Sequence, residues 1–157
     1  MRDSMAILEA INLKEAKVVN AKYDDNNAGT WTTRNDIIPL EALRGKKTLS
    51  RLSFPEIITY IGGYAFYGTR LSGALIIPTD VEEIAHDAFA GSMIGNVSFP
   101  GKLKKIDTWA FGGCSALSGT LVLPESLSYI GDYAFYECAF TGSLILPKNF
   151  AYYCSLD

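Results

Sequence analysis

The stretch IGGYAF, Ile61 to Phe66, recurs almost unchanged as IGDYAF, Ile130 to Phe135. The interval between the two copies is 69, which is three times 23, and two weaker copies stand between them: IAHDAF from Ile84 to Phe89, and IDTWAF from Ile106 to Phe111. Self-similarity at a fixed period of roughly 20 to 50 residues is the signature of a repeat architecture. The chain is therefore predicted to be built of repeats.

A proline marks the same place in each repeat. Five prolines recur at successive intervals of 23, 22, 24 and 23: Pro55, Pro78, Pro100, Pro124 and Pro147. Proline lacks an N–H and fixes φ, so a proline at the end of a strand stops strand pairing and turns the chain. Apolar residues stand one, three and six or seven residues before each proline, as in Leu71, Leu75 and Ile77. This is the L-x-x-L-x-L pattern of leucine-rich repeats, in which alternate residues of a short strand face one interior.

Further apolar positions follow each proline. Three and six residues after it come Ile58 and Ile61, Val81 and Ile84, Leu103 and Ile106, and Leu127 and Ile130. An Ala-Phe pair comes next, in which alanine lets a neighbouring coil approach and burial of phenylalanine contributes about 1.5 to 3 kcal/mol. Gly68, Gly91 and Gly113 stand two residues after each Phe, where a short helical turn would need a left-handed stop.

These spacings predict a repeat solenoid of about six repeats of 22–24 residues, made mainly of short parallel β-strands with short helical turns. Residues 49–157 are expected to form the regular solenoid, with a shortened last repeat. Residues 1–48 are expected to form an irregular long repeat or cap with an inserted loop near residues 19–35, because Ile11 fits the strand pattern and Ile38 precedes Ile61 by one repeat interval. A cap helix over residues 4–16 is the alternative.

Two stretches carry a resemblance to a known family. LSFPEIITYIGGYAFYGTRLSGALIIP, Leu52 to Pro78, and LSGTLVLPESLSYIGDYAFYECAFTGSLILP, Leu117 to Pro147, resemble the BspA-like leucine-rich repeats, whose motif runs roughly L-x-x-I-x-L-P-x-x-L-x-x-I-G-x-x-A-F-x-x-C. The resemblance spans residues 49–147, and proline in place of the usual asparagine marks this subclass. It implies a right-handed solenoid from a bacterial surface or secreted protein that mediates adhesion, and hence an extracellular or cell-surface location.

The composition fits an ordinary globular domain: 157 residues, 48% apolar, 20% charged, and a net charge of −3. Mild acidity argues against a sequence-independent grip on nucleic acid, and the nearest basic run, Lys102, Lys104 and Lys105, is short. No apolar run approaches the roughly 18 residues of a membrane span, and the start MRDSMAILEA lacks the layout of a signal peptide. We expect a protein or glycan partner, with a host surface among the options, and neither nucleic acid nor membrane insertion.

The candidate binding residues lie on the outward side of the predicted strands, two and four residues before each proline. They are Arg51 and Ser53, Ala74 and Ile76, Asn96 and Ser98, Thr120 and Val122, and Ser143 and Ile145. Three β-branched apolar residues among them, Ile76, Val122 and Ile145, could form part of a sticky concave surface that marks a partner site. The alternative is strand propensity alone, since exposed β-branched residues suit a pleated sheet.

A second candidate surface is an aromatic ladder. Tyr64, Trp109 and Tyr133 share one position of the repeat, and Tyr60 and Tyr129 share another. Aromatic surfaces can grip sugars or partner proteins. The alternative is that these rings prop one coil against the next at the turns.

Cys114 and Cys138 share a position in adjacent repeats and would stack about 5 Å apart, the strand spacing. Either a disulfide or a ladder of small buried thiols follows, with Cys154 left over. The loop Tyr23 to Asp36 is rich in side-chain oxygens that suit Ca²⁺, but it lacks the fixed spacing of a calcium loop and is otherwise a solvated insertion.

Catalysis has little support in the sequence. His86 is the only histidine, and we find no nucleophile elbow, phosphate loop or zinc spacing. The sequence thus predicts a non-catalytic binding or adhesion module that uses its concave sheet face and needs no cofactor or metal. The alternative is a structural spacer within a longer array, with the ligand bound elsewhere.

Overall fold

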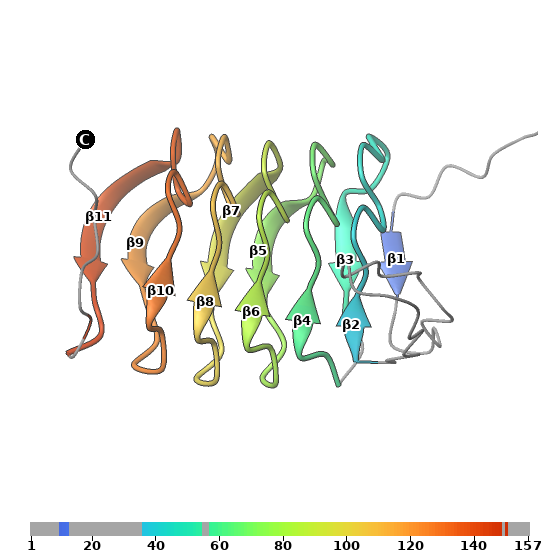
Figure 1. Cartoon of the computed structure of the whole chain (residues 1–157). Helices are drawn as coiled ribbons and strands as arrows, with labels where there is room; N and C mark the ends of the chain where they lie inside the picture. Colours follow the sequence, from blue (N-terminus) through green and yellow to red (C-terminus); the bar gives the residue numbers. More distant parts are fainter. Residues whose placement is uncertain (1–9, 13–35, 55–56, 149, 151–157) are drawn as a thin grey trace, which may run out of the picture.

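The computed structural model is a β-solenoid in which each coil contributes one long and one short strand (Figure 1). It describes residues 10–12, 36–54, 57–148 and 150. The chain runs along a long strand, turns at the proline, returns along a short strand, and passes through a second turn into the next coil. All strand pairs in the described part are parallel, and the predicted repeat solenoid is confirmed.

The short strands form one five-stranded sheet in the order β10-β8-β6-β4-β2. Its strands are β2 (Ile37–Ile38), β4 (Tyr60–Ile61), β6 (Glu83–Ile84), β8 (Lys105–Ile106) and β10 (Tyr129–Ile130). The isoleucine of the repeated hexapeptide aligns with its counterpart in each neighbouring strand, from Ile38 through Ile61, Ile84 and Ile106 to Ile130. The interval of the sequence repeat is therefore the length of one coil.

The long strands form the opposite row and pair two by two. They are β1 (Ala10–Asn12), β3 (Arg51–Ser53), β5 (Ser72–Ile76), β7 (Met93–Ser98), β9 (Ser118–Val122) and β11 (Ala139–Ile145). The pairs are β1-β3, β5-β7 and β9-β11, and β7 also contacts β9.

The N-terminal part joins the same row. Strand β1 pairs with β3, with Ile11 opposite Leu52, so residues 10–12 continue the strand pattern and are not helical. The rest of the alternative helix over residues 4–16 and the predicted insertion near residues 19–35 lie outside the described residues. The division of the chain at residue 48 stays a prediction.

The core is a column of side chains that runs along the length of the solenoid. Phe66, Phe89, Phe111 and Phe135 stack in sequence, with ring centroids 5.1, 5.2 and 5.5 Å apart and interplanar angles of 10°, 10° and 6°. The alanine before each of these rings is also buried. Because each repeat places the same side chain at the same height, the interior is filled by like packing on like.

The last described long strand departs from this pattern. The sequence pattern predicts that Leu144 faces the interior like Leu75 and Leu121, but Leu144 is 53% exposed, whereas the other two are 7% and 8% exposed. Leu144 lies opposite Leu121 in the β11-β9 pair. In the described part of the chain no strand pairs with the other side of β11, so this leucine lacks the neighbouring coil that covers its counterparts.

The predicted helical turns are series of hydrogen-bonded turns, and no helix occurs among the described residues. The reason is that two residues in each turn have left-handed backbone. One is a glycine in every described turn but the last, with φ of 61° at Gly68 and 67° at Gly91, and is Glu137 with φ of 55° in the last. The other, four residues earlier, is not glycine: φ is 53° at Tyr64 and 55° at Asp87. A right-handed helix cannot continue through such residues.

Candidate functional site

The outward side of the long strands, which we call the long-strand face, carries the predicted binding residues. It comprises the exposed residues Arg51, Ser53, Ala74, Ile76, Asn96, Ser98, Thr120, Val122, Ser143 and Ile145. The alternation predicted for the strands is observed, because Ile76 is 72% exposed between the buried Leu75 and Ile77, and Val122 is 54% exposed between two buried leucines.

The three apolar residues of the long-strand face do not form one continuous patch. Val122 lies opposite Ile145 in the β9-β11 pair, so these two side chains are neighbours. Ile76 lies opposite Ser98 in the β5-β7 pair, so a serine stands beside it. The other outward column, Arg51, Ala74, Asn96, Thr120 and Ser143, holds no large apolar side chain.

The aromatic ladder occupies the non-glycine left-handed position of the turns. Trp109 stacks on Tyr133 with centroids 5.2 Å apart, as the predicted ladder requires. Tyr64 does not join them, because Asp87 holds the same position in the coil between and has a φ of 55°. Asp87 is not among the residues predicted from the sequence, although the repeated hexapeptides show it as the single non-aromatic member of the series.

Two of these turns carry a second aromatic ring, three residues after the ring of the ladder. Tyr64 meets Tyr67, and Tyr133 meets Tyr136, each pair with centroids 5.5 Å apart and with interplanar angles of 66° and 88°. Tyr129, in the other predicted aromatic position, is exposed and has the Lys105 ammonium 5.6 Å from its ring centroid.

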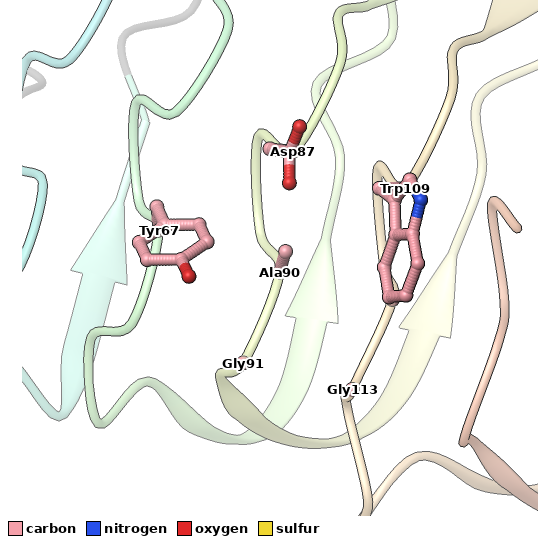
Figure 2. A pocket seen from close by; sticks show the side chains of 7 residues that line it. Tyr67, Asp87, Ala90, Gly91, Trp109 and Gly113 are labelled. Carbon is pink, nitrogen blue, oxygen red and sulfur yellow. The ribbon is translucent and has the colours of Figure 1, made fainter.

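A pocket of about 500 Å³ lies where the aromatic ladder is interrupted. Figure 2 shows the rings of Tyr67 and Trp109 on either side, with Asp87 and Ala90 between them. Gly91, Gly112 and Gly113 complete the lining. The pocket therefore combines two aromatic walls, a carboxylate and a floor of small residues.

The carboxylate of Asp87 has polar neighbours on one side. The negative charge of Asp87, followed by burial and a hydrogen bond to Asp87, raises the pKa of Tyr64. The Nδ1 atom of His86 lies 3.5 Å from the Asp87 Oδ2 atom, and the His86 ring packs edge-on against the Tyr64 ring at 4.9 Å. His86 thus borders this surface with the Asp87 carboxylate beside its ring.

The basic run of the sequence is paired with acidic residues of the preceding coil. Lys104 Nζ lies 2.8 Å from a Glu82 carboxylate oxygen, and Lys102 bonds Asp80 in the same way. Lys105 bridges Glu83 and Asp107 at 3.0 and 2.9 Å. Burial opposes the charge of Lys105, but the hydrogen bonds to its two carboxylates prevail and raise the lysine pKa. These lysines therefore form a ladder of ion pairs between coils.

Cys114 and Cys138 are free thiols. The Sγ atom of Cys114 lies 3.3 Å from the carbonyl oxygen of Phe89, and that of Cys138 lies 3.3 Å from the carbonyl oxygen of Phe111. Burial raises the pKa of Cys114, and burial followed by the neighbouring Cys114 raises the pKa of Cys138 to about 12. The thiol-ladder alternative is confirmed for these two residues; Cys154 lies outside the described part.

The part of the chain that the structure describes contains neither a cluster of metal ligands nor a membrane-spanning helix. No group of three or more His, Cys, Asp or Glu side chains is placed to hold a metal ion within residues 10–12, 36–54, 57–148 and 150. Within the same ranges no helix is long and apolar enough to cross a membrane. The oxygen-rich loop suggested for Ca²⁺ lies outside the described residues, apart from Asp36.

The parallel coils, the buried apolar ladder and the proline turns define a leucine-rich-repeat solenoid. The protein-family model for the BspA type leucine rich repeat region matches residues 36–155 in six copies. This chain therefore belongs to the family of BspA-type leucine-rich repeat proteins. It is also similar to the crystal structure of a T. pallidum leucine-rich repeat protein, with a TM-score of 0.60 and 31% identity over 71% of this chain. The chain spans about half of that protein, 52% of its length. A comparison with curated proteins finds no match.

Proposed function

We propose that this chain is a non-catalytic protein-binding module that serves adhesion at the surface of a bacterial cell or in its secretions. The partner lies on the long-strand face. Repeat solenoids present extended surfaces of this kind, on which successive coils each contribute a few side chains to one interface. The membership of the BspA-type family supports a recognition role.

The observation that carries the proposal is the exposure of large apolar side chains on this face. Ile76, Val122 and Ile145 are each at least half exposed. A β-branched residue on the outer side of a strand costs nothing in folding, but burial of three such side chains against a partner would contribute about 1.5 to 3 kcal/mol each. Small polar residues around them, such as Ser98 and Thr120, suit the rim of an interface.

The test is adhesion of beads coated with the whole chain to a layer of epithelial cells. The variant carries Ile76→Lys and Val122→Lys, which place two charges that any contact on the long-strand face would have to desolvate. The matched control carries Leu40→Lys and Ile57→Lys, which make the same chemical change at exposed positions of 50% and 68% off that face.

The proposal predicts a loss of at least tenfold in bead adhesion for the face variant and a change of less than twofold for the control. Both variants should keep the circular dichroism and melting temperature of the parent, because exposed substitutions usually change stability by less than about 0.5 kcal/mol. Equal adhesion of both variants and the parent would exclude the long-strand face as the binding surface.

A structural spacer is the second candidate. It is favoured by the outward column that runs from Arg51 to Ser143, in which small and polar residues predominate. A spacer predicts that beads coated with the parent chain adhere no better than beads coated with albumin. It also predicts that neither double lysine variant changes bead adhesion.

A further inference from the structure

Each turn carries two positions that are bound to each other. We call them a turn pair: the non-glycine left-handed residue and the residue three later, whose N–H donates to the carbonyl of the first at 2.9–3.2 Å. The pairs in chain order are Glu41 with Arg44, Tyr64 with Tyr67, Asp87 with Ala90, Trp109 with Gly112, and Tyr133 with Tyr136. Because the coils are in register, each turn pair faces the next one along the solenoid.

The first two turn pairs build a complete cation site. The guanidinium carbon of Arg44 lies 4.7 Å from the ring centroid of Tyr64 and 5.4 Å from that of Tyr67. The same guanidinium forms an ion pair with the carboxylate of Glu41. A cation over aromatic faces and beside a carboxylate is held by cation–π attraction and by a charge-assisted hydrogen bond.

The third and fourth turn pairs repeat only part of this arrangement: the carboxylate and one ring are kept, but the cation is absent and Gly112 stands where the second pair has Tyr67. Asp87 stands where the first pair has Glu41, and Trp109 stands where the second has Tyr64. Ala90 stands in the position of Arg44. An alanine side chain ends at Cβ and leaves open the space that an arginine would occupy here, which is part of the pocket of about 500 Å³ between Tyr67, Asp87 and Trp109 (Figure 2).

The tryptophan wall of the pocket is held in place before any ligand arrives. Trp109 stacks on Tyr133, and Tyr136 packs against its other edge with centroids 5.2 Å apart. The ring lies against the backbone of Gly112, where a Cβ atom would come 2.3 Å from Trp109 Cε3. A wall fixed in this way binds a flat group without a large loss of side-chain entropy.

We infer that this pocket is a binding site for the guanidinium group of an arginine side chain carried by a partner, with the carboxylate of Asp87 as its anion and the rings of Tyr67 and Trp109 as its walls. A planar guanidinium can stack on an aromatic ring and bond a carboxylate at the same time, which a compact ammonium does less well. The inference goes beyond the proposed function, because the pocket lies at the turns and not on the long-strand face. Either one can fail without the other.

The test uses fluorescence of Trp109 in the full chain with Trp31→Phe, so that a single tryptophan reports. The probes are N-acetyl-L-arginine amide, the neutral and nearly isosteric N-acetyl-L-citrulline amide, and methyl glycosides of glucose, galactose and mannose. We expect saturable quenching by the arginine amide with a Kd on the order of 1 mM, the range for a ligand of this size. The citrulline amide should bind at least about tenfold more weakly, since it lacks the charge.

The key variant is Asp87→Asn. Asparagine tolerates the left-handed backbone at this position, so the turn should keep its shape. Arginine amide should bind at least about tenfold more weakly to it. The control is Asp132→Asn, which removes the same charge from an exposed carboxylate one coil beyond Trp109 that does not line the pocket, and it should change the Kd by less than about twofold.

A second variant, Ala90→Arg, restores in this turn the residue type that the first turn has. It should quench Trp109 without ligand and abolish the response to arginine amide; because Ala90 is only 3% exposed, circular dichroism checks that the turn accepts the longer side chain. The inference is overturned if citrulline amide binds as well as arginine amide, if Asp87→Asn leaves the Kd unchanged, or if a methyl glycoside alone binds, which would make the pocket a sugar site.

Discussion

Removal of one ring from the phenylalanine column should destabilise the whole solenoid. Phe111 has no exposed surface, lies 5.2 Å from Phe89 and 5.5 Å from Phe135 in stacked geometry, and meets Phe99 edge-on at 5.7 Å. Loss of a buried phenylalanine side chain costs about 3 to 5 kcal/mol when a cavity remains. We expect the upper half of that range for Phe111→Ala, because three ring contacts are lost and the coils on both sides are fixed in register and cannot collapse into the space.

The measurement is the free energy of unfolding from urea denaturation, followed by circular dichroism. Tyr129→Ala is the control, since this ring is 47% exposed and its loss should cost less than about 1 kcal/mol. Coils of a solenoid contact only their neighbours, so amide exchange in the Phe111 variant should rise first in the coils around β8. A decrease in unfolding free energy of less than about 1 kcal/mol, or an unchanged melting temperature, would refute the stacking of equivalent phenylalanine rings as the core of the solenoid.

Three other predictions concern single positions. Cys138 should react with a thiol reagent at pH 8 only at the rate of global or local unfolding, as should the fully buried Cys114, because burial raises the pKa of both thiols. Mass spectrometry of the peptides that contain Cys114 and Cys138 after timed labelling checks this, and rapid labelling of either residue in the folded chain would count against it. Gly131→Ala should destabilise the chain by more than about 2 kcal/mol, since its Cβ would come 2.2 Å from the Thr108 backbone nitrogen. Gly101→Ala is the control: no atom lies within 4 Å of its Cβ, so it should leave the free energy of unfolding almost unchanged in the same urea titration. Burial opposes the charge of Asp107, but the hydrogen bonds from Lys105 and the Thr108 N–H outweigh it and lower the carboxyl pKa below its usual value. The ionised Asp107 therefore stabilises the folded chain above the unfolded-state pKa, and this stabilisation is lost as pH falls below about 4. Asp107→Asn should flatten the acid limb of a curve of unfolding free energy against pH.

The regular part of the fold could be predicted from the sequence because each repeat buries apolar side chains at the same positions. The spacing of Ile61, Ile84 and Ile106 gives the register of the short strands directly, and the residue parity around Ile76 gives its exposure. Even Ile11, in an irregular part of the chain, lies in a strand as its pattern predicts and pairs with Leu52. Periodic burial fixes these positions without any knowledge of loop geometry.

The turns could not be read in the same way. Their path depends on left-handed backbone at Tyr64 and Trp109, residue types that rarely adopt it and give no sequence signal for it. The sequence therefore presents these aromatic positions only as a ladder, which is either a gripping surface or a set of props between coils. The pocket depends instead on what is small, Ala90 and Gly112, and on a ring orientation that only coordinates show.

The fate of Leu144 shows a limit of periodicity itself. The repeat pattern states which way a side chain points but not whether another coil covers it. Leu121 and Leu144 have the same position in the repeat and differ in exposure by a factor of more than six, 8% against 53%.

The most direct measurement of the proposed function is site-specific photo-crosslinking on epithelial cells. A benzoylphenylalanine replaces Ser98, which lies on the long-strand face opposite Ile76 in the β5-β7 pair, or replaces the exposed Tyr129 of the short-strand row. The proposal predicts a discrete adduct with a cell-surface protein from position 98 and none from position 129. An adduct from position 129 alone, or equal adducts from both positions, would contradict binding through the long-strand face.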